Sequence, residues 1–337
     1  MSSETLTPPR ADSLRASVRL TPALFIAVVA WWGLAALMIY WPDKPVGFAP
    51  PRFVTETHRV FVFLAAALTL VVVSGRLFSL PALLAPLQRG GRWLVALALL
   101  IAIWEAVTAK LGLLPVPFFA PPRALIEAWA TDWFRLGDSV LNSLRLLALG
   151  FLFGSITGFI TGVAIGWSRG LGYWVHPVLR FLGPVPSTAL LPLSLYFFPS
   201  SFSAAVFLIA LATWFPVTVL TWSGVASVDE RYYDVARTLG ASTLFLVLRV
   251  AVPASLPQVF VGLFMGLGAS FSVLVAAEMM GVKSGLGWYL QWAQGWAAYA
   301  NMYGALIVMA LLFSSLITLL FAVRDRSLAW QRGTVKW

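Results

Sequence analysis

Residues 228–253 form a short charged segment in a chain that is otherwise largely apolar. We expect a helix that starts at Glu230 and ends before Gly240, because glycine readily adopts the left-handed conformation found just past a helix C-terminus. Ser242 can then N-cap a second helix that runs to Pro253. The segment therefore has the features of a docking surface for another protein: two short helices joined by a tight turn, with charged residues at its edge.

The spacing within this segment is specific. An acidic residue, an alanine and a glycine are followed, after nine intervening residues, by two aliphatic positions and a proline, at Asp234, Ala236, Gly240, Val250, Val252 and Pro253. Ala236 is small enough for close packing against a partner, with Asp234 and Arg237 at the edge of the contact. We interpret Asp234, Ala236, Arg237, Gly240 and Pro253 as residues that couple this chain to a partner. The alternative is an ordinary loop between two membrane spans.

Polar side chains in otherwise apolar stretches are candidates for lining a transport pathway. Prolines at 184 and 186 break the entry to a span, and backbone groups freed in this way need a polar or protein-lined environment. The candidates are Ser187, Thr188, Ser194, Thr213, Thr218, Ser270, Ser272 and Glu278. Each hydroxyl has the alternative of bonding to its own helix backbone, and Glu278 has the alternative of marking the membrane interface. Glu105 and Lys110 lie about 140° apart around a helix, so we do not expect them to pair.

A ladder of glycines four residues apart predicts close helix packing. Small residues at this spacing let two helices approach closely. The ladder comprises Gly150, Gly154, Gly158, Gly162, Gly166 and Gly170, and Gly262 and Gly266 repeat the pattern.

Several kinds of chemistry have no motif in this chain. There is no phosphate-binding G-x-x-x-x-G-K-[ST] motif and no H-E-x-x-H motif, and cysteine is absent. The two histidines, His58 and His176, are far apart in the sequence. We therefore expect neither a metal site nor a cofactor in this chain, and we expect it not to be an enzyme that hydrolyses ATP alone.

The composition places the elements that carry these residues in a lipid bilayer. Of the 337 residues, 60% are hydrophobic and 11% are charged, whereas a soluble domain has about 25% charged residues. Long charge-free runs without period-two alternation predict membrane-spanning helices and exclude a barrel. We attribute the net charge of +10 to loops that face anionic lipid and the cytoplasm, and not to nucleic-acid binding.

Eight spans are expected, at about 20–41, 58–75, 93–113, 145–166, 183–198, 203–223, 255–277 and 303–323. With both termini in the cytoplasm, the cytoplasmic segments carry 15 of the 23 Lys and Arg residues. This orientation places residues 228–253 in the cytoplasm. We divide the chain into an N-terminal extension, 1–90, with two spans and a linker at 76–92, and a six-span unit, 91–337.

Several stretches resemble one known family. The 228–253 segment is similar to the EAA signature of ABC importer membrane subunits, although Asp234 replaces the usual Glu and Val235 the usual first Ala. The other stretches are Phe119-Ala120-Pro121-Pro122, Pro184-Val185-Pro186-Ser187, Ala276-Ala277-Glu278-Met279 and Gly285-Leu286-Gly287. From about residue 93 onward the chain looks like permeases of the nitrate/sulfonate/taurine/bicarbonate group of ABC importers. Typical members have the six-span unit alone, so residues 1–90 depart from the pattern.

The resemblance implies an all-α polytopic protein of the bacterial inner membrane, with a six-helix type I importer unit and two extra N-terminal helices. It implies import of a small oxyanion or organic acid, a second permease copy, an extracytoplasmic substrate-binding protein, and a cytoplasmic ATPase dimer that holds ATP and Mg. Two other hypotheses stay open at this point. One is an ion-coupled secondary transporter, which would need charges at the membrane midplane. The other is a membrane scaffold that does not transport.

Overall fold

The structure is a computed structural model that describes residues 21–44, 57–78, 80–115 and 117–331. Every regular element among these residues is helical. The chain divides into two compact units, residues 1–131 and 132–337. The boundary falls inside one long helix, α4 (Pro122–Trp167), where Asp132 leaves helical geometry with φ −113° and ψ 18°.

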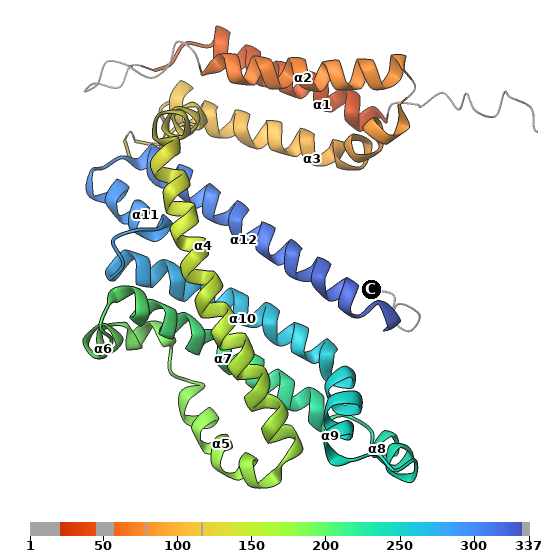
Figure 1. Cartoon of the computed structure of the whole chain (residues 1–337). Helices are drawn as coiled ribbons and strands as arrows, with labels where there is room; N and C mark the ends of the chain where they lie inside the picture. Colours follow the sequence, from red (N-terminus) through yellow and green to blue (C-terminus); the bar gives the residue numbers. More distant parts are fainter. Residues whose placement is uncertain (1–20, 45–56, 79, 116, 332–337) are drawn as a thin grey trace, which may run out of the picture. The chain divides into compact units, whose positions relative to one another are not determined.

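The first unit is built on three helices, α1 (Pro22–Tyr40), α2 (His58–Leu77) and α3 (Pro81–Glu105), and each packs against the other two (Figure 1). A turn of π-helix, Ala106–Lys110, extends α3. The apolar core of the unit contains Trp31, Leu34, Ala35, Met38, Phe61, Ala65 and Ala98, and a second cluster contains Leu24, Val72 and Leu84. The expected linker at 76–92 is wrong for most of its length, because α3 already begins at Pro81. The helix continues through Gly91. A Cβ there would lie 3.3 Å from the backbone nitrogen of Leu24, so the glycine lets α3 approach α1 closely.

Four charged side chains lie together in the first unit. Lys110 Nζ lies 2.8 Å from Asp43 Oδ1, and an Arg123 guanidinium nitrogen lies 2.7 Å from Asp43 Oδ2. Arg123 Nε lies 2.5 Å from Glu105 Oε1. Glu105, Lys110 and Arg123 are buried, whereas Asp43 is exposed, so Arg123 neutralises Glu105 away from water and Asp43 pairs with both cations at the edge of the cluster. As expected, Glu105 and Lys110 have different partners, although the sequence did not predict either partner.

The second unit begins with the rest of α4. Its other elements are α5 (Arg169–Leu182), a 3₁₀ turn (Ser187–Leu190), α6 (Leu191–Phe197), α7 (Ser201–Ala226), α8 (Glu230–Thr238), α9 (Thr243–Phe245), a π-helical turn (Leu246–Ala251), α10 (Val252–Met280), α11 (Leu286–Gly295), α12 (Tyr299–Ser327) and a 3₁₀ turn (Ala329–Gln331).

The glycine ladder of α4 packs against α7, as the sequence predicts. A Cβ on Gly150 would lie 2.5 Å from Ile209 Cβ, and one on Gly162 would lie 2.5 Å from Thr221 Cβ. Such distances are far shorter than ordinary van der Waals contact, so only glycine fits. Gly154, Gly158 and Gly166 meet α7 in the same way, whereas Gly170 lies in α5 and takes no part. Gly262 and Gly266 of α10 also approach α7 closely, at Val217 and Thr213.

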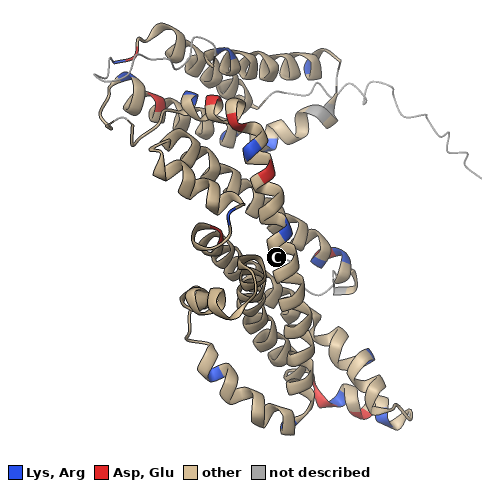
Figure 2. Cartoon of the chain, turned by 60° about the vertical axis from the view of Figure 1, so that its left-hand side comes forward, with Lys and Arg blue, Asp and Glu red and all other residues tan. Residues whose placement is uncertain are grey.

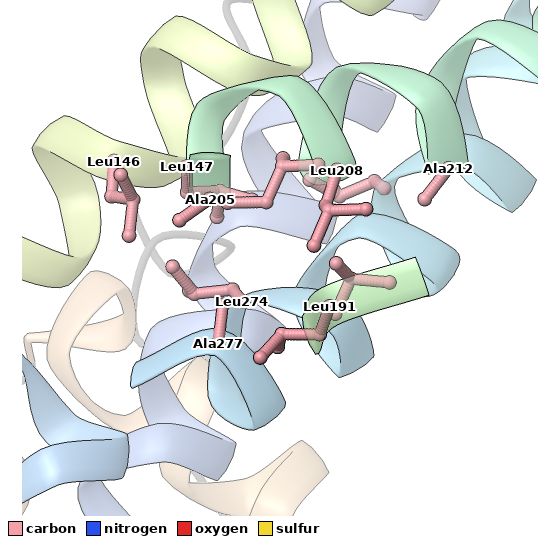
Figure 3. Close-up of a cluster of buried hydrophobic side chains, with 11 residues drawn as sticks. Leu146, Leu147, Leu191, Ala205, Leu208, Ala212, Leu274 and Ala277 are labelled. Atoms are coloured by element: carbon pink, nitrogen blue, oxygen red, sulfur yellow. The ribbon is translucent and has the colours of Figure 1, made fainter. Parts of the chain in front are cut away.

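The apolar core of the second unit is formed by α4, α6, α7 and α10. It contains Leu146, Leu147, Leu191, Ala205, Leu208, Ile209, Ala212, Leu267, Val273, Leu274 and Ala277. Figure 3 shows these side chains meeting between the helices. The glycine ladders and this cluster together fix the position of α7 between α4 and α10.

Seven helices within the described residues are long and apolar enough to cross a membrane, or eight if one bent pair is a single span. The bent pair is α5 with the 187–197 segment, and it turns by 87°. The expected fifth span at 183–198 is therefore wrong as one straight helix. The sequence also placed residues 169–182 in a loop, whereas they form α5. Both helices of the N-terminal extension, Pro22–Tyr40 and His58–Leu77, are among the seven.

Candidate functional site

The 228–253 segment folds as two helices around a tight turn, and local chemistry explains each step. Asp229 N-caps α8, with Oδ1 accepting from the backbone nitrogen of Arg231 at 2.9 Å. At the other end of α8, Gly240 has φ +81°. Its N–H donates to the carbonyl of Arg237 at 2.9 Å, and the N–H of Ala241 donates to the carbonyl of Ala236 at 3.0 Å. This pair of bonds is the Schellman motif.

The second helix starts where the sequence predicts and ends elsewhere. Ser242 Oγ accepts from the backbone nitrogen of Phe245 at 3.4 Å, which makes it the N-cap of α9. The expected end at Pro253 is wrong, because α9, the π-helical turn and α10 form one helix from Thr243 to Met280. Pro253 follows directly after the π-helical turn and so lies inside this continuous helix, at the start of α10. The segment is thus rigidly continuous with a helix of the core.

We call residues 228–253 the elbow. None of the side chains of α8 is buried within the chain. Exposed apolar residues lie beside exposed charges on the elbow: Leu239 is 81% exposed, and Tyr232, Val235, Leu244 and Phe245 are also exposed. Asp234 and Arg237 form an exposed ion pair at 3.3 Å. Figure 2 shows charged residues gathering at the α8 end of the second unit, whereas the helices beside it carry few.

The elbow is held by a ring contact from α8 to α4 and by a partly buried π-helical turn of its own. The ring of Tyr233 meets that of Trp167, the last residue of α4, edge to face at 5.6 Å between centroids. Burial at this contact raises the pKa of Tyr233, and the nearby Arg237 partly opposes the rise. In the π-helical turn, Leu246 and Ala251 are buried, and this turn also contacts α8. The elbow is therefore exposed on one side and anchored on the other.

The candidate pathway residues are dispersed over several helices. Ser194, Thr213, Thr218, Ser270 and Glu278 are buried within the chain, Ser187 is half-buried, and Thr188 and Ser272 are exposed. Four of the hydroxyls, those of Ser194, Thr213, Ser270 and Ser272, donate to a carbonyl of their own helix. For these four, the bond to the helix backbone that the sequence left open as an alternative is present.

Glu278 is buried and takes part in an internal cap. Only 1% of its surface is exposed. One carboxylate oxygen accepts from Ser143 Oγ at 2.6 Å, and the other accepts from the backbone nitrogen of Gly287 at 2.8 Å. The sequence singled out Glu278 but gave no signal for Ser143, because a serine in an apolar helix is ordinary.

A second polar cluster joins the break in α4 to α11 and α12. Tyr289 Oη donates to Asp132 Oδ2 at 2.8 Å, and Asn301 Nδ2 donates to Tyr289 Oη at 2.8 Å. The Arg135 guanidinium lies 4.4 Å from the ring centroid of Trp292. Burial raises the pKa of Tyr289 to about 12, and its bond to Asp132 adds to the rise. Sequence reasoning missed this cluster.

The described residues hold no group of three or more His, Asp or Glu side chains placed to bind a metal ion. The arrangement as a whole is that of a bundle of apolar helices with one exposed, charged and rigidly connected elbow.

Comparisons with known proteins agree with this arrangement. The family described as "binding-protein-dependent transport system inner membrane component" matches residues 150–330. Nitrate import permease protein NrtB of Synechococcus elongatus is 30% identical over 252 residues, 71% of this chain and 87% of that protein. A probable ABC transporter permease of Brucella abortus is 32% identical over 239 residues, 71% of this chain and 94% of that protein. Taurine transport system permease protein TauC of Escherichia coli is 31% identical over 245 residues, 69% of this chain and 87% of that protein.

The family match covers more than half of the chain and includes the elbow, α7, α10 and α11. Together with several apolar helices long enough to cross a bilayer, it establishes what kind of protein this is. The chain belongs to the family of binding-protein-dependent transport system inner membrane components, and it is the permease subunit of an ABC importer rather than an enzyme.

Proposed function

We propose that this permease imports a small oxyanion or organic acid, driven by a separate ATPase that docks on the elbow. The observation that carries the coupling is the elbow itself. Its outer surface combines exposed apolar side chains with an exposed ion pair, and its second helix continues without a break into α10. A push on the elbow is thereby transmitted to a helix of the bundle core.

The proposed cycle needs three partners. ATP and Mg bind in the ATPase dimer, a second copy of the permease completes the pore, and an extracytoplasmic binding protein delivers the substrate. Closure of the ATPase dimer moves the docked elbows, and the pore switches its opening between the two sides as a rigid-body transition. In this arrangement the elbow and both termini face the cytoplasm, and the extra helices α1 and α2 belong to an added N-terminal extension.

The proposed substrate class is supported by the names of the relatives. They include permeases for nitrate and taurine, and a putative permease for aliphatic sulfonates in Bacillus subtilis that is 28% identical over 240 residues. All of these substrates carry an oxyanion group. Asp234, Ala236, Arg237, Gly240 and Pro253 are the proposed coupling residues, and the exposed Thr188 and Ser272 are the pathway candidates open to a partner surface.

The first test is to purify the tagged chain from its native membrane in mild detergent and identify the proteins that copurify. We expect a P-loop ATPase in near-stoichiometric amount, and proteins encoded beside it would narrow the substrate. Its reproducible absence from an intact, monodisperse preparation would contradict the coupling and favour a secondary transporter or a scaffold.

A substitution at the turn tests the elbow directly. No atom lies within 4 Å of a Cβ added to Gly240. Gly240→Val therefore acts through backbone strain, because a β-branched residue disfavours the positive φ of this position. We expect reduced yield of the ATPase complex and reduced ATPase stimulation. Gly295→Val is the matched control, since it also has open space and lies at the end of α11. Equal complex yield and stimulation for both variants and the wild type would refute the role of the elbow.

A further inference from the structure

One face of α5 carries a row of polar and aromatic side chains. Arg169, Tyr173, His176 and Arg180 follow at spacings of four, three and four residues. At 100° per residue these positions fall within about 60° of one another, so they share one face of the helix. With Trp222 of α7 they line a cavity of about 490 Å³ that is open to the surroundings.

The cavity is positively charged. It is lined by two arginines and by no carboxylate. Neither Arg169 nor Arg180 has a hydrogen bond or ion pair with any other residue in the part of the chain that the structure describes, whereas Arg123 and Arg237 are both paired. Each guanidinium offers five N–H donors in a planar fork that suits phosphate and carboxylate oxygens. Two such groups beside one cavity attract an anionic group.

The wall of the cavity is well ordered by local contacts. His176 Nδ1 lies 2.5 Å from the carbonyl oxygen of Gly172. Because a carbonyl oxygen can only accept, Nδ1 carries the proton and donates this hydrogen bond. The imidazole ring also meets the ring of Trp222 edge to face at 4.4 Å between centroids. Gly172 is buried, and a Cβ there would lie 3.1 Å from His176 Cε1, so the glycine provides room for the imidazole. The aromatic wall is therefore fixed before any ligand binds.

The size and surroundings of the cavity favour an amphiphile over a free ion. A volume of about 490 Å³ is in the range of sites for organic molecules and far exceeds the roughly 30 Å³ of a water molecule. The two arginines are about 16 Å apart along the helix axis, which suits an extended group better than a single small anion. The rest of the lining is largely apolar or aromatic and includes Ile165, Pro177 and Trp222.

We propose that α5 and α7 form a binding site for the headgroup of an anionic phospholipid. Arg169 and Arg180 pair with the phosphate and with other polar oxygens of the headgroup, while the lining residues Ile165, Pro177 and Trp222 contact its apolar part. Basic cavities between membrane helices commonly hold anionic headgroups in this way. No residue of the elbow lines the site, and the proposal goes beyond the proposed transport function, so either can fail without the other.

The test compares lipid binding by the full chain, purified in detergent and delipidated, using native mass spectrometry. The probes are phosphatidylglycerol, which is anionic, and phosphatidylcholine, which has a phosphate but no net charge. We expect preferential binding of phosphatidylglycerol by the wild type. The double variant Arg169→Gln/Arg180→Gln should bind it roughly tenfold more weakly, through the loss of charge-assisted hydrogen bonds.

The matched control is Arg92→Gln/Arg326→Gln, which removes two other exposed arginines and gives the same net charge. Circular dichroism checks that each variant keeps its helices. Equal affinity of the wild type and the Arg169/Arg180 variant for phosphatidylglycerol would overturn the proposal, and so would an equal loss of affinity in the control.

A third experiment compares sodium sulfate with sodium chloride at matched ionic strength. If sulfate displaced phosphatidylglycerol from the wild type, the site would be one for free oxyanions and the lipid assignment would be wrong.

Discussion

Ser143 Oγ donates to Glu278 Oε1 at 2.6 Å, across 135 positions of sequence. The same Ser143 oxygen accepts from the backbone nitrogen of Leu286 at 2.8 Å, and Glu278 Oε2 accepts from that of Gly287 at 2.8 Å. Two side chains from α4 and α10 thus satisfy the first backbone donors of α11. Gly285 precedes these donors with φ +101°, and a Cβ there would collide with the Glu278 carboxylate. The carboxylate therefore acts as a helix cap supplied from another helix.

Replacing Glu278 should destabilise this junction. Glu278→Leu leaves the Gly287 N–H and the Ser143 hydroxyl without an acceptor in a buried place, where each unmet donor costs about 1–3 kcal/mol. Glu278→Gln keeps one acceptor oxygen and should lose less. Thermal unfolding of the purified chain in detergent measures both. Glu230→Gln, at an exposed glutamate, is the control and should change the unfolding temperature little. A wild-type unfolding temperature for Glu278→Leu would contradict this role.

The elbow shows what sequence reasoning can predict. Its turn depends on local chemistry, so Gly240 and Ser242 were both identified as the residues that end one helix and start the next. The glycine ladder is similarly local, because spacing alone determines which face the glycines occupy. The prediction that the second helix ends at Pro253 is wrong because proline usually ends or kinks a helix, whereas here the helix continues through Pro253 after a π-helical turn.

The polar pairs show what the sequence could not predict. Asp43 with Arg123, and Ser143 with Glu278, are each brought together by packing of helices that are distant in the sequence. No periodicity in one segment indicates such a partner. α5 was missed for a different reason: its arginines and Pro177 are typical of a loop, yet they occupy exposed positions of an amphipathic helix. Coupling residues, pathway residues and the domain boundary at residue 90 stay predictions.

Enlarging a ladder glycine should disrupt packing between α4 and α7. Gly162→Leu would drive a side chain into Thr221 and the carbonyl of Thr218, and overpacking of this kind costs about 1–3 kcal/mol or more. The expected result is a lower unfolding temperature in detergent. Gly137→Ala is a matched control on the same helix, because no atom lies within 4 Å of its added Cβ. This control should be neutral or slightly stabilising, since alanine favours a helix by up to about 1 kcal/mol. A similar loss of stability in both variants would contradict this explanation, because the added side chain at Gly137 does not contact α7.

Breaking the charge cluster of the first unit should be costly. Arg123→Leu leaves the buried Glu105 carboxylate without its cation, and an uncompensated charge of this kind costs about 3–5 kcal/mol. Arg76→Leu, at an exposed arginine of α2, would test a cation outside the cluster by the same measurement of thermal unfolding. If Arg123→Leu unfolded no more easily than the control, the cluster would contribute nothing net to stability.

The same cluster predicts how stability responds to acid. Partial burial raises the pKa of Asp43, but the hydrogen bonds from Lys110 and Arg123 outweigh it, and the net shift is downward. A carboxyl with a lowered pKa in the folded state contributes stability at pH values above its ordinary pKa. That stability is lost as the pH falls through the lowered value. We expect the unfolding temperature of the wild type to fall below about pH 4, the ordinary range of an aspartate, and Asp43→Asn to flatten that part of the profile. If Asp43→Asn showed the same dependence of unfolding temperature on pH as the wild type, the loss of stability in acid would come from other carboxyl groups.

Tyr289 should show the opposite response at high pH. Its pKa is raised to about 12, first by burial and then by the Asp132 carboxylate that accepts a hydrogen bond from its hydroxyl. A group with a raised pKa contributes stability below its ordinary pKa near 10, and that stability is lost as the pH rises through the raised value. Tyr289→Phe removes the hydroxyl that joins Asp132 to Asn301, so it should lower stability at neutral pH by about 1–2 kcal/mol. It should also remove part of the loss of stability between about pH 10 and 12. Tyr196→Phe, at an exposed tyrosine, should leave both measurements unchanged. If Tyr289→Phe matched that control, the bond from Tyr289 to Asp132 would not hold α11 to the break in α4.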